Sequence, residues 1–180
     1  MSSRIAPVDP ASTNGQSKEL LERARTNFGT IPNLLKTMAH SPAVLDGFLS
    51  LRGALGKGEL STSTREQIAL AVSESNESEY CLAAHSLTAK IAGLKPEQVV
   101  AARRGFADDP HTQAVLRLTQ HVVERTGKVS DEQLQKARAA GMTDAEIVEV
   151  VGNVAVMVLT NYLNNVAQTV VDFPKVAAVA

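Results

Sequence analysis

Apolar residues recur every three or four positions through most of the chain, and Ser, Asp, Gly and Pro lie between the periodic stretches. This spacing is typical of amphipathic helices. Convincing period-two alternation around a hairpin turn is absent, so we expect no strands. The pattern predicts an all-α fold, a compact antiparallel helical bundle joined by short turns. The predicted helices cover 18–27, 32–39, 43–55, 78–92, 96–104 and 108–127, with others starting after 63, 130 and 143, the last and longest reaching 170.

The chain of 180 residues is long enough for one domain with a sizeable core. Residues 1–16 are rich in Pro, Ser, Thr, Asn and Gly without apolar periodicity, so we expect an extended N-terminal arm, either mobile or draped on a neighbouring subunit. Residues 17–174 form the predicted single domain, with Ser17 as the cap of its first helix. Residues 175–180 are the expected C-terminal tail.

Composition and charge exclude several classes of protein. The formal net charge is −1 and forms no basic stripe, so we expect no nucleic-acid partner. The single cysteine leaves no disulfide framework and no Cys-rich metal site, and we expect no cofactor. The first ten residues, MSSRIAPVDP, lack an apolar signal-peptide core, so we expect a cytoplasmic location. Polar residues interrupt the apolar stretch 145–171, which predicts a buried or interface helix and no membrane span: Glu146, Glu149, Asn153, Asn161, Asn164, Asn165 and Gln168.

The best-spaced reactive set in the sequence lies between Glu66 and His85. If 78–85 is helical, Cys81 and His85 are four residues apart and share one face. An imidazole beside a thiol can take its proton or, once protonated, stabilise the thiolate. Glu66, from the preceding helix, would orient His85 as the third member of the set. The polar run SESNESE breaks that helix and places Cys81 near a new helix N-terminus, which favours a thiolate.

Each member of this set also has a plainer interpretation. Ser63-Thr64-Arg65-Glu66 has the form of a capping box, in which Glu66 bonds the backbone of Ser63. Cys81 can be a small buried hydrophobe beside a hydrogen-bonded core histidine. Glu66, Cys81 and His85 can also supply three zinc ligands.

Other polar residues have less specific interpretations. His40, His111 and His121 have no partner motif and are expected at the surface, at caps or in packing. A polar cluster interrupts the last apolar helix, and its buried amides require partners, either in another subunit or around a pocket near Cys81. This cluster consists of Asn161, Tyr162, Asn164 and Asn165.

The spacing resembles the alkylhydroperoxidase D-like branch of the carboxymuconolactone decarboxylase superfamily. Its signature is a Glu, eleven residues, then Cys-x-x-Cys-x-x-x-His. Glu66 stands at the Glu position, Ser78 at the first Cys, Cys81 at the second and His85 at the His. Two flanking sequence segments resemble those of peroxidase-related members: FGTIPNLLKTMAHSP and GMTDAEIVEVVGNVAVMVLTNYLNNVAQTVVDFP. The resemblance therefore spans residues 28–174.

The resemblance implies a thiol-dependent peroxidase, an antioxidant enzyme acting on a hydroperoxide. Cys81 would be the peroxidatic thiol, with His85 and Glu66 as its proton relay. Ser78 occupies the resolving position, where a hydroxyl cannot form the disulfide, so activity is expected to be impaired. Ser78 is either a natural variant that needs an external thiol or disulfide reductase, or a Cys-to-Ser substitution that traps one state. Tyr80 replaces a second His found in mycobacterial-type members.

Two other functions remain open. A carboxymuconolactone decarboxylase-like enzyme would act on a lactone acid, and an arginine pocket for that acid would be its sign. A non-catalytic oligomeric binding protein would leave Cys81 inert toward peroxides. The resemblance also implies a homo-oligomer, a trimer or hexamer, and the apolar final helix is expected to contribute to subunit contacts.

Overall fold

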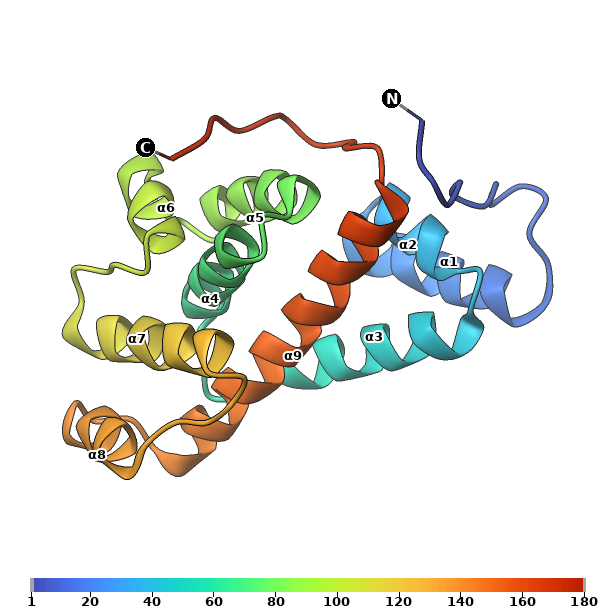
Figure 1. The fold of residues 1–180 in the computed structure, drawn as a ribbon. Coiled ribbons are helices and arrows are strands. Elements are labelled where there is room, and N and C mark those ends of the chain that lie inside the picture. The colour runs from blue at the N-terminus through green and yellow to red at the C-terminus, as the bar shows by residue number, and fades with distance from the viewer. Residues whose placement is uncertain (1, 180) are drawn as a thin grey trace.

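The computed structural model describes residues 2–179, which form nine helices and no strand (Figure 1). The all-α prediction is confirmed for this part of the chain. In order, the helices are α1 (Gly15–Phe28), α2 (Asn33–Met38), α3 (Pro42–Leu55), α4 (Thr62–Ser75), α5 (Glu79–Ile91), α6 (Pro96–Arg103), α7 (Pro110–Glu124), α8 (Asp131–Ala139) and α9 (Asp144–Ala167).

Helix α4 is the centre of the fold and packs against α5, α6, α7 and α9. Its apolar residues Ile68, Leu70 and Val72 are fully buried. Helix α9 runs diagonally across the molecule and separates α1–α3 from α4–α8 (Figure 1). Its inner side carries Val150, Val154 and Met157 into the core. The two helices that carry Glu66 and the Cys81–His85 pair, α4 and α5, are therefore neighbours in the centre of the molecule.

Capping boxes open α8 and α9, whereas the box predicted at Ser63–Glu66 is wrong. Ser130 and Thr143 cap α8 and α9 in reciprocal boxes with Gln133 and Glu146. Helix α4, however, begins at Thr62, because the hydroxyl of Ser61 accepts the hydrogen bond of the Thr64 amide at 3.1 Å. Two serines compete for this N-terminus, and the earlier one gains the cap.

The first helix also begins earlier than predicted. Asn14 is its N-cap and Gly29 ends it in the left-handed conformation, with φ 73°. Ser17 lies inside the helix, and its hydroxyl donates to the carbonyl of Ala39 at 2.8 Å. The Ser17 hydroxyl therefore ties α1 to the end of α2. At the other end of the chain, α9 stops at Ala167, three residues before the predicted end, because Gln168 adopts a left-handed conformation.

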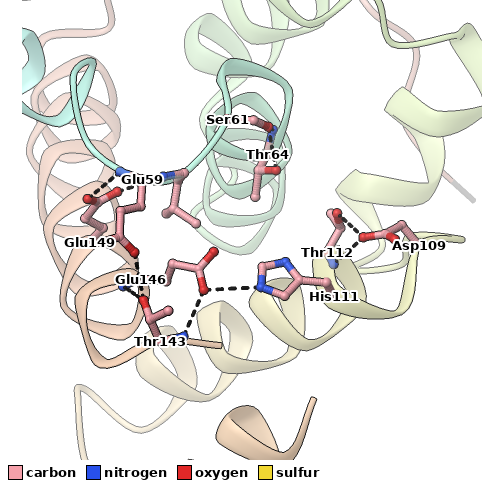
Figure 2. Close-up of polar contacts among 10 residues, drawn as sticks. Glu59, Ser61, Thr64, Asp109, His111, Thr112, Thr143, Glu146 and Glu149 are labelled. Carbon is pink, nitrogen blue, oxygen red and sulfur yellow. Dashed lines mark hydrogen bonds and ion pairs between the residues drawn. The ribbon is translucent and has the colours of Figure 1, made fainter. Parts of the chain in front are cut away.

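Acidic side chains at the start of α9 hold the loop that precedes α4 (Figure 2). The carboxylate of Glu149 accepts hydrogen bonds from the amides of Glu59 and Leu60, at 2.7 and 3.0 Å. Gly58 lies so close to this carboxylate that a Cβ at position 58 would overlap it. Since this loop leads directly into Thr62, its attachment to α9 fixes where α4 begins and thus where Glu66 lies.

His111 is also partnered at this end of α9. Its Nε2 lies 3.2 Å from the carboxylate of Glu146 (Figure 2). The same carboxylate accepts the amide of Thr143 in the capping box, at 2.9 Å. His111 thus links α7 to the first turn of α9 and lies at a helix cap.

The segments before α1 and after α9 lie against the chain itself. The amides of Arg4 and Ile5 both donate to the carbonyl of Ala167, at 2.7 and 3.3 Å. At the other end, the carbonyl of Ala177 accepts a hydrogen bond from Arg103 at 2.8 Å. The red C-terminal segment thus passes over α5 to reach α6 (Figure 1).

Within residues 2–179, α9 alone is long and apolar enough to cross a membrane by length and composition. Core helices of soluble proteins pass the same test, and one face of α9 is packed into the core described above.

Candidate active site

Cys81 lies in the first turn of α5, as predicted. Ser78 is the N-cap residue of this helix, and Cys81 is three positions later. The turn is buried: Ser78 has no exposed surface and the exposed fraction of Cys81 is 2%. A thiol at this place lies near the unpaired amides and the positive end of the helix dipole, both of which stabilise a thiolate.

Glu66 and His85 are joined by a hydrogen bond. Nδ1 of His85 lies 2.7 Å from Oε2 of Glu66. Glu66 is buried, with an exposed fraction of 8%, and it takes no part in a capping box. The capping interpretation of this glutamate is therefore wrong, since its carboxylate is directed across to α5.

Thr88 is a third member of this arrangement, and the sequence analysis missed it. Its hydroxyl donates to the same oxygen of Glu66, at 2.5 Å. Cys81, His85 and Thr88 follow one another at spacings of four and three, so they lie along one face of α5. That spacing was visible in the sequence and could have identified Thr88.

The pKa of Glu66 is lowered below its ordinary value. Burial alone would raise it, because a low-dielectric environment disfavours the charged carboxylate. The charge of His85, the hydrogen bonds from His85 and Thr88 and the charge of Arg52 together outweigh burial. Glu66 is therefore ionised at neutral pH and accepts the Nδ1 proton of His85, which leaves Nε2 as the atom available for proton exchange.

The amide of Asn164 is the hydrogen-bond partner of the cysteine. Its Nδ2 donates to Sγ of Cys81 at 3.3 Å, and both residues are buried. Asn161 instead binds Ser73 and Asn76, and Asn165 binds the carbonyl of Asn76. The predicted polar cluster thus has two roles in this chain, because Asn164 faces the thiol while its neighbours tie α9 to the end of α4.

The hydroxyl of Ser78 has no hydrogen-bond partner among the described residues, although it is buried. A buried hydroxyl without a partner costs about 1–3 kcal/mol. A thiol carries a much weaker donor and acceptor and fits such a place at lower cost. The surroundings of position 78 thus suit a sulfur atom better than the hydroxyl that occupies them.

A cavity of about 260 Å³ opens in front of Cys81. His85 and Thr88 share its wall, and most of the remaining wall is apolar. Within residues 2–179 no hydrogen bond joins the Cys81 sulfur directly to His85. Both side chains line the same cavity. The apolar lining includes Phe28, Leu34, Leu35, Phe48, Ile91 and Met157.

Arg52 lines this cavity, and Arg65 lines a neighbouring one. The guanidinium of Arg52 stacks over the ring of Phe28, 4.6 Å from its centroid. Arg52 and His85 also line a second cavity of about 100 Å³, which contains Glu66 and Arg65. Local spacing around Cys81 gives no sign of this arginine, because Arg52 comes from α3.

Tyr80, the residue before the cysteine, fastens this turn of α5. Its hydroxyl donates to Asp172 at 2.7 Å and accepts the amide of Leu34 at 3.1 Å. Burial and the neighbouring Asp172 hold the pKa of Tyr80 well above its usual range, so the hydroxyl keeps its proton. The edge of its ring also packs on Phe173, with 5.5 Å between ring centroids. Tyr80 therefore links the Cys81 turn to α2 and to the segment after α9.

In the part of the chain that the structure describes, no group of three or more His, Cys, Asp or Glu side chains is arranged to hold a metal ion.

Comparisons with known proteins identify similar sequences and folds. Residues 42–121 match the carboxymuconolactone decarboxylase family. An alkyl hydroperoxide reductase of Mycobacterium tuberculosis is 31% identical over 90 residues, which make up 49% of this chain and 26% of that protein. The match thus spans about a quarter of the length of the curated relative.

Solved structures share the whole fold. A peroxidase-related protein from Ralstonia eutropha with an alkylhydroperoxidase AhpD core has a TM-score of 0.85 and 24% identity, over 96% of this chain and 93% of its own. A Cys-to-Ala variant of the debrominase Bmp8, in complex with 2,3,4-tribromopyrrole, has a TM-score of 0.79 and 18% identity, also over 96% of this chain and 93% of its own. The resemblance drawn from the spacing of Glu66, Cys81 and His85 is confirmed, since residues 42–121 match the carboxymuconolactone decarboxylase family and similar folds occur in proteins named as peroxidase-related.

Proposed function

We propose that this chain is a thiol-dependent peroxidase in which Cys81 is the peroxidatic residue. The observation that carries the proposal is the wall of the 260 Å³ cavity, where the single thiol lies beside a histidine that is held by an ionised glutamate. The family match of residues 42–121 and the name of the mycobacterial relative support a peroxide-reducing activity.

The reaction follows from the side chains in the cavity. The thiolate of Cys81 attacks the distal oxygen of a hydroperoxide, so that an S–O bond forms as the O–O bond breaks. The sulfur loses two electrons and becomes a sulfenic acid, while the leaving alkoxide takes a proton from His85 and departs as an alcohol. Glu66 holds the imidazole by its Nδ1 and stabilises it in its protonated form. Asn164 donates to the sulfur and favours its anionic state.

Reduction of the sulfenic acid requires a thiol from outside the chain. Ser78 stands at the resolving position, and its hydroxyl cannot form a disulfide with Cys81. One external thiol condenses with the sulfenic acid and releases water, and a second thiol reduces the mixed disulfide and restores Cys81. We propose a cytoplasmic thiol or a disulfide reductase as this partner, and impaired turnover when none is supplied.

Intact-mass analysis tests the proposal. The reduced protein, a Cys81→Ser variant and a Ser78→Cys variant each receive a small excess of cumene hydroperoxide. We expect one added oxygen on the reduced protein, none on Cys81→Ser, and an internal disulfide in Ser78→Cys. With dithiothreitol present, both forms that retain Cys81 should consume hydroperoxide. If Cys81 reacts no faster than free cysteine, the peroxidase proposal is wrong and a non-catalytic binding protein becomes the better hypothesis.

We further propose that the chain forms a homo-oligomer through the outer face of α9. Large apolar side chains on this face are exposed in the single chain, and extended apolar patches of this kind mark protein interfaces. Light scattering of the protein and of a Val151→Glu variant tests this, with a fall in mass expected for the variant. The exposed residues are Val148, Val151, Leu159, Tyr162 and Val166.

A carboxymuconolactone decarboxylase-like activity is the second candidate. The observation in its favour is the pair Arg52 and Arg65 beside the cavity, since arginines bind carboxylates well. Loss of carbon dioxide from carboxymuconolactone, followed by absorbance, tests it directly. Full activity in the Cys81→Ser variant would favour this candidate over the peroxidase, because decarboxylation does not require the thiol.

A further inference from the structure

Arg52 carries a positive charge to the border between the two cavities. It lines the 260 Å³ cavity that holds Cys81 and the 100 Å³ cavity that holds Glu66. Its guanidinium lies over the ring of Phe28 in a cation–π contact, which favours one position of the group. An arginine stacked in this way keeps its N–H edges free to bind a planar anion.

Arg65 adds a second positive charge in the 100 Å³ cavity. Two hydrogen bonds hold its guanidinium, one to the carbonyl of Leu60 and one to the hydroxyl of Thr62 at 3.1 Å. Within residues 2–179, neither Arg52 nor Arg65 has a carboxylate within 4 Å. Both arginines are therefore without a counter-ion in direct contact.

The nearby Glu66 does not neutralise both arginines. It contributes one negative charge, and its Oε2 is already bound by His85 and Thr88. The pKa of Arg52 is lowered by burial and by the charge of Arg65, while the charge of Glu66 raises it. Two guanidiniums beside a single carboxylate leave an excess positive charge in the 100 Å³ cavity, which shares Arg52 with the cavity of Cys81.

We propose that the substrate of this site is a compact apolar hydroperoxide that carries a carboxylate, with the carboxylate bound by Arg52 and Arg65. Most of the wall of the cavity in front of Cys81 is aromatic or aliphatic and suits a ring or a short hydrocarbon chain. An acid held at the shared border extends its apolar body past Phe28 toward the sulfur. This inference rests on the proposed peroxidase function and adds the class of substrate to it.

Binding of a ligand without a peroxide group tests the anion site independently of the chemistry. Calorimetric titration of the reduced protein compares 4-isopropylbenzoate with 4-isopropylbenzamide, which has the same shape and no charge. We expect the acid to bind about tenfold more tightly, since a charge-assisted hydrogen bond contributes roughly 1.5–3 kcal/mol. In Arg52→Gln this preference should disappear, and Arg52→Lys should retain part of it.

Arg125→Gln is the matched control, because Arg125 is an exposed arginine after the end of α7, away from both cavities. Circular dichroism confirms that each variant is folded. The proposal is overturned if the acid and the amide bind equally, if neither binds, or if the preference for the acid persists in Arg52→Gln.

Kinetics then separate the anion site from the peroxidase proposal. Cumene hydroperoxide and its para-carboxylate differ only in the charged group. We expect a higher kcat/KM for the carboxylate, and a ratio between the two substrates near one in Arg52→Gln. If neither hydroperoxide reacts while 4-isopropylbenzoate still binds through Arg52, the peroxidase proposal fails and acid recognition stands. If both react equally in the wild-type protein, the peroxidase proposal stands and acid recognition fails.

Discussion

Asn164 donates a hydrogen bond to the sulfur of Cys81 at 3.3 Å, although the two residues are 83 positions apart in the sequence. The other polar atom of this amide, Oδ1, has no partner among the described residues. The amide already presents its N–H group to the sulfur in the free protein. Stabilisation of the thiolate therefore needs no rearrangement of the protein.

Replacing Asn164 with Ala should slow the reaction of Cys81. Loss of the donor removes stabilisation of the anionic sulfur, and we expect iodoacetamide alkylation at neutral pH to slow by about tenfold, which corresponds to roughly 1.4 kcal/mol. Asn165→Ala is the control, since Asn165 binds the carbonyl of Asn76 instead. Equal rates for the wild type and Asn164→Ala would show that the amide does not act on the sulfur.

The ionised state of Glu66 makes stability depend on pH. Because the pKa of Glu66 in the folded chain lies below its ordinary value of 4.5, the contribution of Glu66 to stability is fully present above that pH. It is lost as the pH falls through the lower folded-state value. Thermal unfolding from pH 7 to pH 3 should therefore show a steeper loss of stability for the wild type than for Glu66→Gln. Parallel curves would contradict this expectation.

Thr88→Val should weaken the relay without breaking the Glu66–His85 contact. The variant removes the hydroxyl donor at 2.5 Å and keeps the shape of the side chain. The carboxylate loses one stabilising hydrogen bond, so the pKa of Glu66 should rise and the acid limb of the peroxidase pH profile should move to higher pH. Thr88→Ser should restore the wild-type profile. An unshifted profile in Thr88→Val would mean that Thr88 only packs.

Ser78 and Ser61 should respond differently to replacement by Ala, although both are N-cap residues. Ser61 accepts the amide of Thr64, so Ser61→Ala should lower the free energy of unfolding by about 1 kcal/mol. Ser78 makes no such bond, so Ser78→Ala should leave stability unchanged or raise it by about 1 kcal/mol. Urea unfolding measures both. Equal losses would reveal a partner for the Ser78 hydroxyl.

Gly58 and Gly53 form another matched pair. A Cβ at position 58 would overlap the Glu149 carboxylate that holds the loop before α4, so Gly58→Ala should cost about 1–3 kcal/mol. Gly53 lies within α3 with no atom in reach of a new Cβ, so Gly53→Ala should stabilise the helix by about 0.5–1 kcal/mol. Urea unfolding should show opposite signs for the two variants. A stabilising Gly58→Ala would show that the contact with Glu149 is loose.

The parts of this site that the sequence could predict depend on local spacing. Cys81 and His85 share a helix face because they are four residues apart, and Glu66 was found through its distance from the same motif. Asn164 contacts the sulfur from α9 and Arg52 lines the cavity from α3. Helical periodicity within one segment does not indicate which distant helix packs against it. The N-cap of α4 was predicted at Ser63 and lies at Ser61 for a similar reason. Two serines this close in sequence offer nearly equal caps, and the tertiary contacts of the loop decide between them.

The dependence of Cys81 on the end of the chain has a consequence for its synthesis on the ribosome. Its amide partner is translated 83 residues after it, and Phe173 of the cavity wall follows nine residues later still. At about 5–20 residues per second, roughly 4–17 s pass before Asn164 is added. The nascent chain therefore carries its thiol without its amide donor, and the wall of the cavity is complete only after Phe173 has been translated.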